Sequence, residues 1–527
     1  MRSQSFLAGI ALVAFANATV AQQANSPGEP KLATTRHQIS VNGTVLKYTA
    51  RVGLIPILNN DAGDVHGHFG FVSYTLDRAQ GQPPRPVVFL WNGGPGANST
   101  TVHFVGFGPR RLRSSDDPAH PPATPVPVEL YDNDATWLDF ADLVFVDPVG
   151  TGFSRPTKPE YAAEFLNTLG DLASTAEFIR LYLTRFDLLN TPVFLAGESY
   201  GTWRASGAAE ALEKKGVRVA GVILISGGVQ MGKVSPDAIR TALFVASRTA
   251  TAFYHKKLAP ELLRDEKATL DEARKWAMTE YAPAWDRRDS LSDADREKTA
   301  MQLARYTGVD PSAIDRKTLM MSSPQFTSTL LRDRNLTLGR YDMRITQPAG
   351  GGRGGAGGAG NAESGTRGSV MMSYIRNDLG FKTDLTYQGI ENGYAPAGAG
   401  GRGAGTQWVW NQGTTTMSSA EASATRAGAA SVGSGDGPPG GSQPWLRRAM
   451  DLDPKITVFV AAGLYDSLNS CADNDYLVSV LEPQFARNFT IGCYGGGHMM
   501  YDTKPARFAL HRDVAAYVRK TVEAFAK

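Results

Sequence analysis

Residues 191–201 read TPVFLAGESYG, an apolar run that ends in a serine between two glycines. The part from 191 to 196 is typical of a strand buried on both faces of a sheet. A helical pattern follows over residues 200–215. The glycines allow a sharp turn between the two elements, so the hydroxyl of Ser199 is expected at the carboxyl edge of the sheet, at the N-terminus of the helix. This context predicts a nucleophilic serine.

Similar apolar runs lie on both sides of this stretch. They cover residues 87–91, 143–147, 219–225 and 456–461, and the stretch itself contributes residues 193–196. Helical patterns between some of them, such as residues 169–186, give the alternation that is typical of a parallel sheet. Residues 36–51 and 66–76 instead alternate apolar and polar side chains, as a half-buried hairpin does. We therefore expect an α/β fold with a mostly parallel central sheet flanked by helices.

Residues 227–445 interrupt this alternation with charged helical patterns and two glycine-rich tracts. The tracts, residues 349–368 and 395–441, have few apolar anchors, so we expect disordered loops there. The whole stretch predicts a largely helical lid inserted into the core. The core is then divided into a first part, residues 30–226, and a second part, residues 446–527.

The chain has 527 residues, of which 42% are hydrophobic and 20% charged, an ordinary balance for a large soluble enzyme. A formal net charge of +3 is too small to favour nucleic acid or an anionic membrane as the partner. Arg2 precedes an apolar run over residues 6–16 and small residues up to Ala21, which predicts an export signal over residues 1–21. The run is shorter than the roughly 20 residues of a spanning helix. We expect a periplasmic or extracellular protein without a membrane span after signal removal.

A serine needs a base to act as a nucleophile, and the base needs an acid that orients it. The apolar run 456–461 leads into Asp466, and residues 489–493 lead into a glycine loop that carries His498. Both side chains therefore follow strand ends, where open α/β sheets hold their active sites. We predict that Ser199 is the nucleophile, Asp466 the orienting acid and His498 the base.

Other histidines and acids compete for these roles. His66 and His68 share one face of a predicted strand, but no third ligand lies nearby, so surface positions are favoured and no metal site is expected. His103 follows the glycine turn at residues 91–96 and either lines the site or, as we favour, is a structural helix histidine. Asp473 and Asp475 lie farther past the strand end. The remaining histidines are His37, His120, His255 and His511.

The developing oxyanion of an acyl-transfer reaction requires backbone donors. Residues 91–96 read WNGGPG directly after a buried strand and predict one donor turn. The amide that follows the serine predicts the second donor. We assign the amides of Gly94 and Tyr200 to this oxyanion hole, each with a contribution of about 3 kcal/mol to the transition state.

The chain contains two cysteines, Cys471 and Cys493, both in the region of the predicted acid and base. In an oxidising compartment they would form a disulfide between the two loops. The alternative is a pair of free thiols. Two cysteines without a matching histidine spacing do not indicate a zinc site.

Four motifs of the chain resemble, in order, those of the serine carboxypeptidases. They are residues 91–96, residues 147–154 (DPVGTGFS), residues 197–201 and Gly497-His498-Met499. The resemblance covers about residues 35–525 outside the glycine-rich tracts, and flanking pieces such as GPR at 108–110 resemble the bacterial branch. It implies the α/β-hydrolase fold, removal of residues from the C-terminal end of peptides through an acyl-enzyme on Ser199, and no cofactor.

The resemblance also implies that Asn92, Gly93 and Glu198 bind the terminal carboxylate of the substrate. A protonated Glu198 donates a hydrogen bond to a carboxylate, whereas an ionised one repels it, so this binding should strengthen in mild acid. The chain departs from the eukaryotic members at two places: Gly106 stands where they have a second glutamate, and Ala97 where they have a cysteine.

Two alternatives keep the same scaffold. A serine esterase or acyltransferase would use the same triad on another acyl donor or acceptor. A non-catalytic binding protein is disfavoured, because the predicted triad and both donor turns are complete.

Overall fold

The computed structural model describes residues 31–525, except 80, 83, 113–115, 118, 121–126, 351–364, 393–406, 412–416 and 419–442. The predicted export signal and most of both glycine-rich tracts lie outside the described residues. Within the described residues, no helix combines the length and the apolar character needed to cross a membrane.

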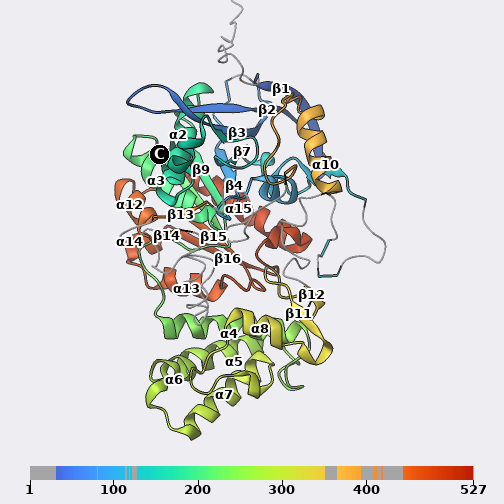
Figure 1. The fold of residues 1–527 in the computed structure, drawn as a ribbon, viewed down its shortest axis with the longest axis vertical. Coiled ribbons are helices and arrows are strands. Elements are labelled where there is room, and N and C mark those ends of the chain that lie inside the picture. The colour runs from blue at the N-terminus through green and yellow to red at the C-terminus, as the bar shows by residue number, and fades with distance from the viewer. Residues whose placement is uncertain are drawn as a thin grey trace, which may run out of the picture.

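A ten-stranded sheet forms the centre of the molecule (Figure 1). Its order is β1-β2-β3-β7-β4-β9-β10-β15-β16, and β8 (Arg155–Pro156) pairs with β3. The antiparallel strands are β1 (Ala33–Val41), β2 (Thr44–Leu58) and β3 (Val65–Leu76). The parallel strands are β7 (Asp142–Asp147), β4 (Val87–Trp91), β9 (Val193–Glu198), β10 (Val219–Ile225), β15 (Thr457–Gly463) and β16 (Phe489–Tyr494). The predicted α/β fold with a mostly parallel sheet is confirmed.

The antiparallel part begins with a tight hairpin. Asn42 and Gly43 join β1 to β2 with positive φ angles of 49° and 81°. An Asn-Gly pair in this conformation matches the twist of the flanking strands. Residues 36–51 of the predicted hairpin therefore contain a turn of their own.

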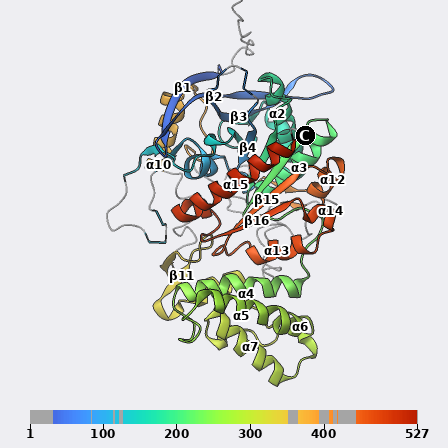
Figure 2. The same ribbon diagram turned by 180° about the vertical axis from the view of Figure 1, so that it is seen from behind.

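Helices cover both faces of the sheet (Figures 1 and 2). On one face, α2 (Thr168–Arg185), α3 (Gly201–Lys214) and α12 (Trp445–Leu452) pack against Val87, Phe89 and Trp91 of β4. On the other face, η1 (Thr101–Phe107), α10 (Thr366–Ser373) and α15 (Lys504–Phe525) pack against Val88 and Leu90. Both faces of β4 are buried, which explains its unbroken apolar sequence.

Helix α10 lies within the predicted lid, residues 227–445, but packs against the sheet. Residues 237–348, called the lid below, form the part that is a separate layer below the sheet in Figure 1, with a hydrophobic core of its own. It contains α4 (Asp237–Tyr254), α5 (Glu266–Trp276), α6 (Ala282–Asp286), α7 (Asp293–Thr307), α8 (Ser323–Thr329), β11 (Leu336–Leu338) and β12 (Thr346–Pro348). Its helices have ordinary sequence boundaries: the Ser292 hydroxyl caps the N-terminus of α7, and Gly308 ends it with a φ of 69°. The short helices α13 (Cys471–Ser479) and α14 (Pro483–Ala486) lie between β15 and β16.

The described parts of the glycine-rich tracts differ from the expectation of disordered loops. Helix α10 begins at Thr366, inside the first predicted tract. In the second, β13 (Val409–Trp410) pairs with β14 (Met417–Ser418), and Val409 N donates to Leu166 O at 3.0 Å. Trp408 and Trp410 are each only 2% exposed. These two side chains are apolar anchors, and their burial gives this short piece the packing energy that the rest of its composition lacks.

Candidate active site

Ser199 lies at the turn between β9 and α3, with a φ of 59°. A positive φ is strained for a residue with a Cβ, and the surrounding contacts hold it there. Its amide donates to Ile225 O at 2.9 Å. A Cβ on Gly197 would lie 1.9 Å from Gly201 O, and one on Gly93 would lie 2.9 Å from the Ser199 Cβ. Only glycine fits at positions 197 and 93, so the loop that contains Gly93 can lie directly against the serine.

Asp466 and His498 come from the loops after β15 and β16 and meet directly. His498 Nδ1 and Asp466 Oδ2 are 2.7 Å apart, and the two residues are 2% and 0% exposed. The carboxylate also accepts hydrogen bonds from Leu468 N at 2.8 Å and from Asn469 Nδ2 at 3.1 Å. These bonds fix the carboxylate in a position where it can orient the imidazole.

The other ring nitrogen of His498 contacts Glu198. Nε2 lies 3.1 Å from Glu198 Oε1. Among the described residues, the Ser199 hydroxyl makes no side-chain hydrogen bond with this imidazole. Burial alone would lower the pKa of His498, but the charges and hydrogen bonds of Asp466 and Glu198 outweigh it and raise that pKa well above its ordinary value.

Glu198 is also joined to the first glycine turn. Asn92 Nδ2 donates to Glu198 Oε2 at 2.8 Å, and Asn92 Oδ1 accepts from Val102 N at 3.0 Å. Asn92 and Glu198 are 4% and 5% exposed. The residues predicted to bind a carboxylate are thus adjacent. A Cβ on Gly106 would lie 3.4 Å from the Tyr501 ring, so this ring lies beside position 106.

The amides of Gly94 and Tyr200 lie in the two turns that meet at the serine. A Cβ on Gly93 would lie 2.5 Å from Tyr200 N, and Gly94 has a φ of 104°. Neither amide donates to an acceptor among the described residues. Two backbone donors without a protein acceptor beside a nucleophile can stabilise an oxyanion.

A buried ion pair ties these two turns to the helices behind them. Arg204 Nε lies 3.0 Å from Asp171 Oδ2, with side chains that are 1% and 3% exposed. Arg204 Nη1 donates to Asn92 O at 2.8 Å, and the Tyr200 hydroxyl donates to Asp171 at 3.1 Å. One pair therefore fixes both the Asn92 turn and the residue after the serine.

Aromatic rings surround the side chain of Tyr200. The centroids of Trp203, Trp408 and Trp410 lie 5.7, 5.5 and 5.6 Å from the Tyr200 centroid. Sequence reasoning missed Trp408 and Trp410, because they lie more than two hundred residues after Tyr200 in a tract whose composition predicts a loop.

The competing histidines and acids have other partners. His103 is 2% exposed, stacks on Phe145 and bonds to the Tyr74 hydroxyl at 2.8 Å. Burial lowers its pKa to about 3, so it is a neutral structural histidine. His66 is more buried than expected and contacts Asp64 and Glu164.

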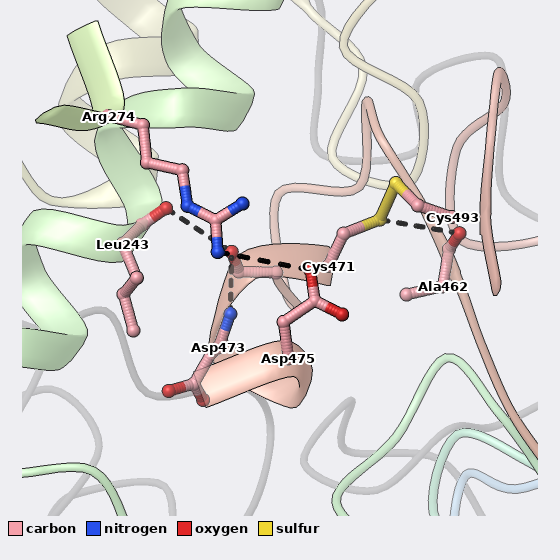
Figure 3. The surroundings of a disulfide bond; sticks show 8 residues. Leu243, Arg274, Ala462, Cys471, Asp473, Asp475 and Cys493 are labelled. Atoms are coloured by element: carbon pink, nitrogen blue, oxygen red, sulfur yellow. Dashed lines mark hydrogen bonds and ion pairs between the residues drawn. A yellow bond between two sulfur atoms is a disulfide. The ribbon is translucent and has the colours of Figure 1, made fainter. Parts of the chain in front are cut away.

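The alternative acids do not contact His498. Asp473 accepts a hydrogen bond from Ser235. Asp475 lies 4.0 Å from Arg274 (Figure 3). Within the described ranges, no group of three or more His, Cys, Asp or Glu side chains is arranged to hold a metal ion.

Cys471 and Cys493 form a disulfide with a Cα–Cα distance of 5.6 Å. The bond joins the start of α13 to β16, as Figure 3 shows. Cys471 follows Asp466 in the chain and Cys493 precedes His498. The disulfide therefore links the segment that follows Asp466 to the segment that precedes His498.

Sequence reasoning also missed two residues that hold Asp466 and His498 in place. Asn469 bonds both to Asp466 and to Ser226 O, at 3.1 and 2.9 Å. The Ser226 hydroxyl donates to His498 O at 2.6 Å. The closeness of Asn469 to Asp466 in sequence was a usable signal. Ser226 gave none beyond its place at the end of β10.

The sequence match to a known family falls within the first part of the core. Residues 58–220 match the sequence profile of the family described as serine carboxypeptidase. The pheromone-processing carboxypeptidase KEX1 of Saccharomyces cerevisiae is 31% identical over 158 residues, and that of Arthroderma otae is 33% identical over 195 residues. These matches cover 28% and 36% of this chain but only 20% and 25% of the relatives.

Solved structures similar to this chain include a prohormone-processing carboxypeptidase from Saccharomyces cerevisiae. It aligns with a TM-score of 0.49 and 16% identity over 93% of this chain and 92% of that chain. A juvenile hormone epoxide hydrolase from the silkworm Bombyx mori aligns with a TM-score of 0.33 and 12% identity over 90% of this chain and 80% of that one.

Proposed function

Because this chain belongs to the serine carboxypeptidase family, we propose that it removes residues from the C-terminal end of peptides through an acyl-enzyme on Ser199. The observation that carries the proposal is the placement of His498 between Asp466 and Glu198, beside the serine turn. One cluster thereby unites an acid–base pair with a candidate reader of carboxylates.

The chemistry follows from the positions of the atoms. The Ser199 hydroxyl attacks the carbonyl carbon of the last peptide bond while His498 Nε2 takes the hydroxyl proton, which requires the imidazole to turn from Glu198 to the serine. The imidazolium gives the proton to the departing amino acid. Water, activated by the same imidazole, then hydrolyses the ester. Nδ1 stays bonded to Asp466 while the ring turns.

The proposed oxyanion hole supports this sequence of steps. Negative charge develops on the carbonyl oxygen in each tetrahedral intermediate, and the amides of Gly94 and Tyr200 are its proposed donors. The pair of Arg204 and Asp171 keeps the two turns at a fixed separation. Donors that are already in place require no reorganisation during the reaction.

The proposed carboxylate site consists of Asn92, Gly93 and Glu198. When Glu198 is protonated, it no longer attracts His498 and becomes a donor to the terminal carboxylate of the peptide. A proton on Glu198 would thus serve two purposes, since it releases the base and favours the substrate. In this chain Glu198 would bind the carboxylate without the second glutamate of the eukaryotic members, because Gly106 stands at the matching position.

We also infer that the protein acts after export, in the periplasm or outside the cell. The disulfide between Cys471 and Cys493 supports this inference, because such bonds persist in oxidising compartments. The sequence of residues 1–21 supports it independently.

A pair of peptides that differ only in a free or an amidated C-terminus tests the proposal. Mass spectrometry after incubation with the wild type should show stepwise shortening of the free-acid peptide alone, and none with Ser199→Ala. If neither peptide is shortened while a simple ester is cleaved in a Ser199-dependent reaction, the peptidase assignment falls and the esterase or acyltransferase alternative replaces it.

A further inference from the structure

A segment of the lid lies against the loop that carries His498. We call this segment, residues 340–344, the strap; it connects β11 to β12. His498 N donates to Tyr341 O at 2.5 Å, and the rings of Tyr341 and His498 are 5.4 Å apart. A Cβ on Gly497 would lie 2.2 Å from Tyr341 O and 2.5 Å from the Asp342 Cβ. The backbone of the base is therefore bound directly by the lid.

The same strap binds both neighbours of the predicted acid. Met343 N donates to Tyr465 O at 3.0 Å, and the Ser467 hydroxyl donates to Arg340 O at 2.6 Å. Ser323, at the start of α8, donates to Ser467 O at 2.8 Å. Asp466 is thus held on either side by a part of the chain that precedes it by more than a hundred residues.

Arg344 fixes the strap to itself and to the core. Its Nε and Nη2 donate to the two carboxylate oxygens of Asp342 at 3.0 and 2.6 Å. Nη2 also donates to the Thr503 hydroxyl at 3.0 Å, and Nη1 lies 3.4 Å from Asp117. The guanidinium carbon lies 5.1 Å from the Tyr465 ring centroid. At 7% exposure, this planar fork holds both the strap and the core in one geometry.

From these contacts we infer that the strap is a positioning element of the acid–base pair and that Arg344 is the positioning residue that locks it. The inference rests on the proposed function in so far as Asp466 and His498 act as acid and base. Proton transfer tolerates only small displacements, and an error of about 1 Å costs on the order of a hundredfold in rate. The lid then contributes to catalysis through the triad itself, in addition to any contact with substrate.

The first test compares Arg344→Met with the wild type on a small phenyl ester, which any Ser-His-Asp hydrolase should cleave. We expect kcat to fall about 10- to 100-fold and KM to change less than about threefold, because the change displaces the base but touches no substrate. Arg305→Met is the matched control. Arg305 lies on α7 in the same lid and pairs with Glu261 at the surface, so its removal should leave kcat unchanged.

A purely structural role for Arg344 predicts a different result. It would lower the melting temperature without changing kcat or the pH profile of the protein that remains folded. A positioning role also moves the acidic limb of kcat/KM to lower pH, since a displaced Asp466 no longer stabilises protonated His498. An unchanged kcat and an unmoved limb in folded Arg344→Met would overturn the inference.

If Arg344→Met does not fold, Ser467→Ala provides the test. This change removes one hydrogen bond to the strap, and we expect kcat to fall about threefold to tenfold at an almost unchanged melting temperature. A kcat equal to that of the wild type would refute the inference. Failure of the proposed function is distinguishable, because a wild type that cleaves the ester but shortens no peptide leaves this test intact. A wild type inert toward both substrates would refute both.

Discussion

His498 contacts a carboxylate through each ring nitrogen, and this double contact explains its raised pKa. A histidine acts as a base only when neutral, so a raised pKa restricts activity to higher pH. Glu198→Gln removes one of the two charges and should lower the pKa of His498. The acidic limb of kcat/KM for a neutral ester should then move to lower pH.

The control for Glu198→Gln is the same substitution at Glu210, which lies on α3. Glu210 pairs with Arg448 and Lys214 at distances of 2.7 and 2.6 Å, and no bond joins it to the active site. Glu210→Gln should leave the acidic limb in place. If the acidic limb of kcat/KM is unchanged in Glu198→Gln, or moves to higher pH, the contact between Glu198 and His498 does not form in solution.

The proposed nucleophile and base are tested by truncation. Ser199→Ala and His498→Ala should each lower kcat by about 10⁴-fold or more, since the nucleophile and the base act as a unit. Ser206→Ala is the control, since Ser206 lies on α3 and its hydroxyl donates to Thr202 O. Turnover near the wild-type rate in either of the first two variants, measured with ester and peptide, would remove that residue from the triad.

At the scale of elements, the pair of Arg204 and Asp171 connects α3 to α2. Both side chains are almost fully buried, so Arg204→Met leaves the Asp171 carboxylate without its charged partner. We expect a loss of about 3–5 kcal/mol in the free energy of unfolding, measured with urea at pH 7. Lys215→Met removes an exposed partner of Glu177 and should cost less than about 1 kcal/mol.

The loss in Arg204→Met should also depend on pH. Burial raises the pKa of Asp171, and Arg204 counteracts this, so the variant should have a higher Asp171 pKa than the wild type. The folded variant then binds a proton that the unfolded chain has released above about pH 4. Its stability falls as the pH rises, so the destabilisation should be smaller at pH 4 than at pH 7. A loss of unfolding free energy that is equal at pH 4 and pH 7 would show that the pKa of Asp171 does not rise in the variant.

The disulfide restrains the connection between β15 and β16. It closes a loop with a sequence separation of 22 residues. Loop-closure entropy then predicts that the double variant Cys471→Ala, Cys493→Ala loses about 3 kcal/mol of unfolding free energy. Addition of a reductant should destabilise the wild type but not the variant. Equal responses of the two proteins would show that the thiols are not paired in solution.

At the scale of the whole molecule, the glycine-rich tracts contribute unequally to stability. Trp408→Ala should cost about 3–5 kcal/mol, because the side chain is buried against Tyr200. Deletion of residues 351–364 should leave the melting temperature nearly unchanged, since their composition offers almost no apolar surface to bury. The cut must end before α10, which begins at Thr366. A large loss on deletion would show that these residues pack.

Local sequence signals predicted much of this protein well. The parallel strands appear where the apolar runs stand, because burial on both faces of a sheet requires such runs. Ser199 and its turn were recognisable from adjacent residues. Asp466 and His498 were recognisable because strand ends in a parallel sheet converge on one edge.

Only the tertiary structure decided how distant segments meet. No local pattern indicates that His498 Nε2 contacts Glu198, that Trp408 packs on Tyr200, or that the strap binds the backbone of the base. Each contact joins residues far apart in the chain, so it depends on the path of the whole lid and on side-chain rotamers. The sequence by itself determined the strands of the parallel sheet and the candidate catalytic residues, because these follow from local periodicity and turn geometry. The mutual orientation of those residues follows from packing, which no short stretch of sequence contains.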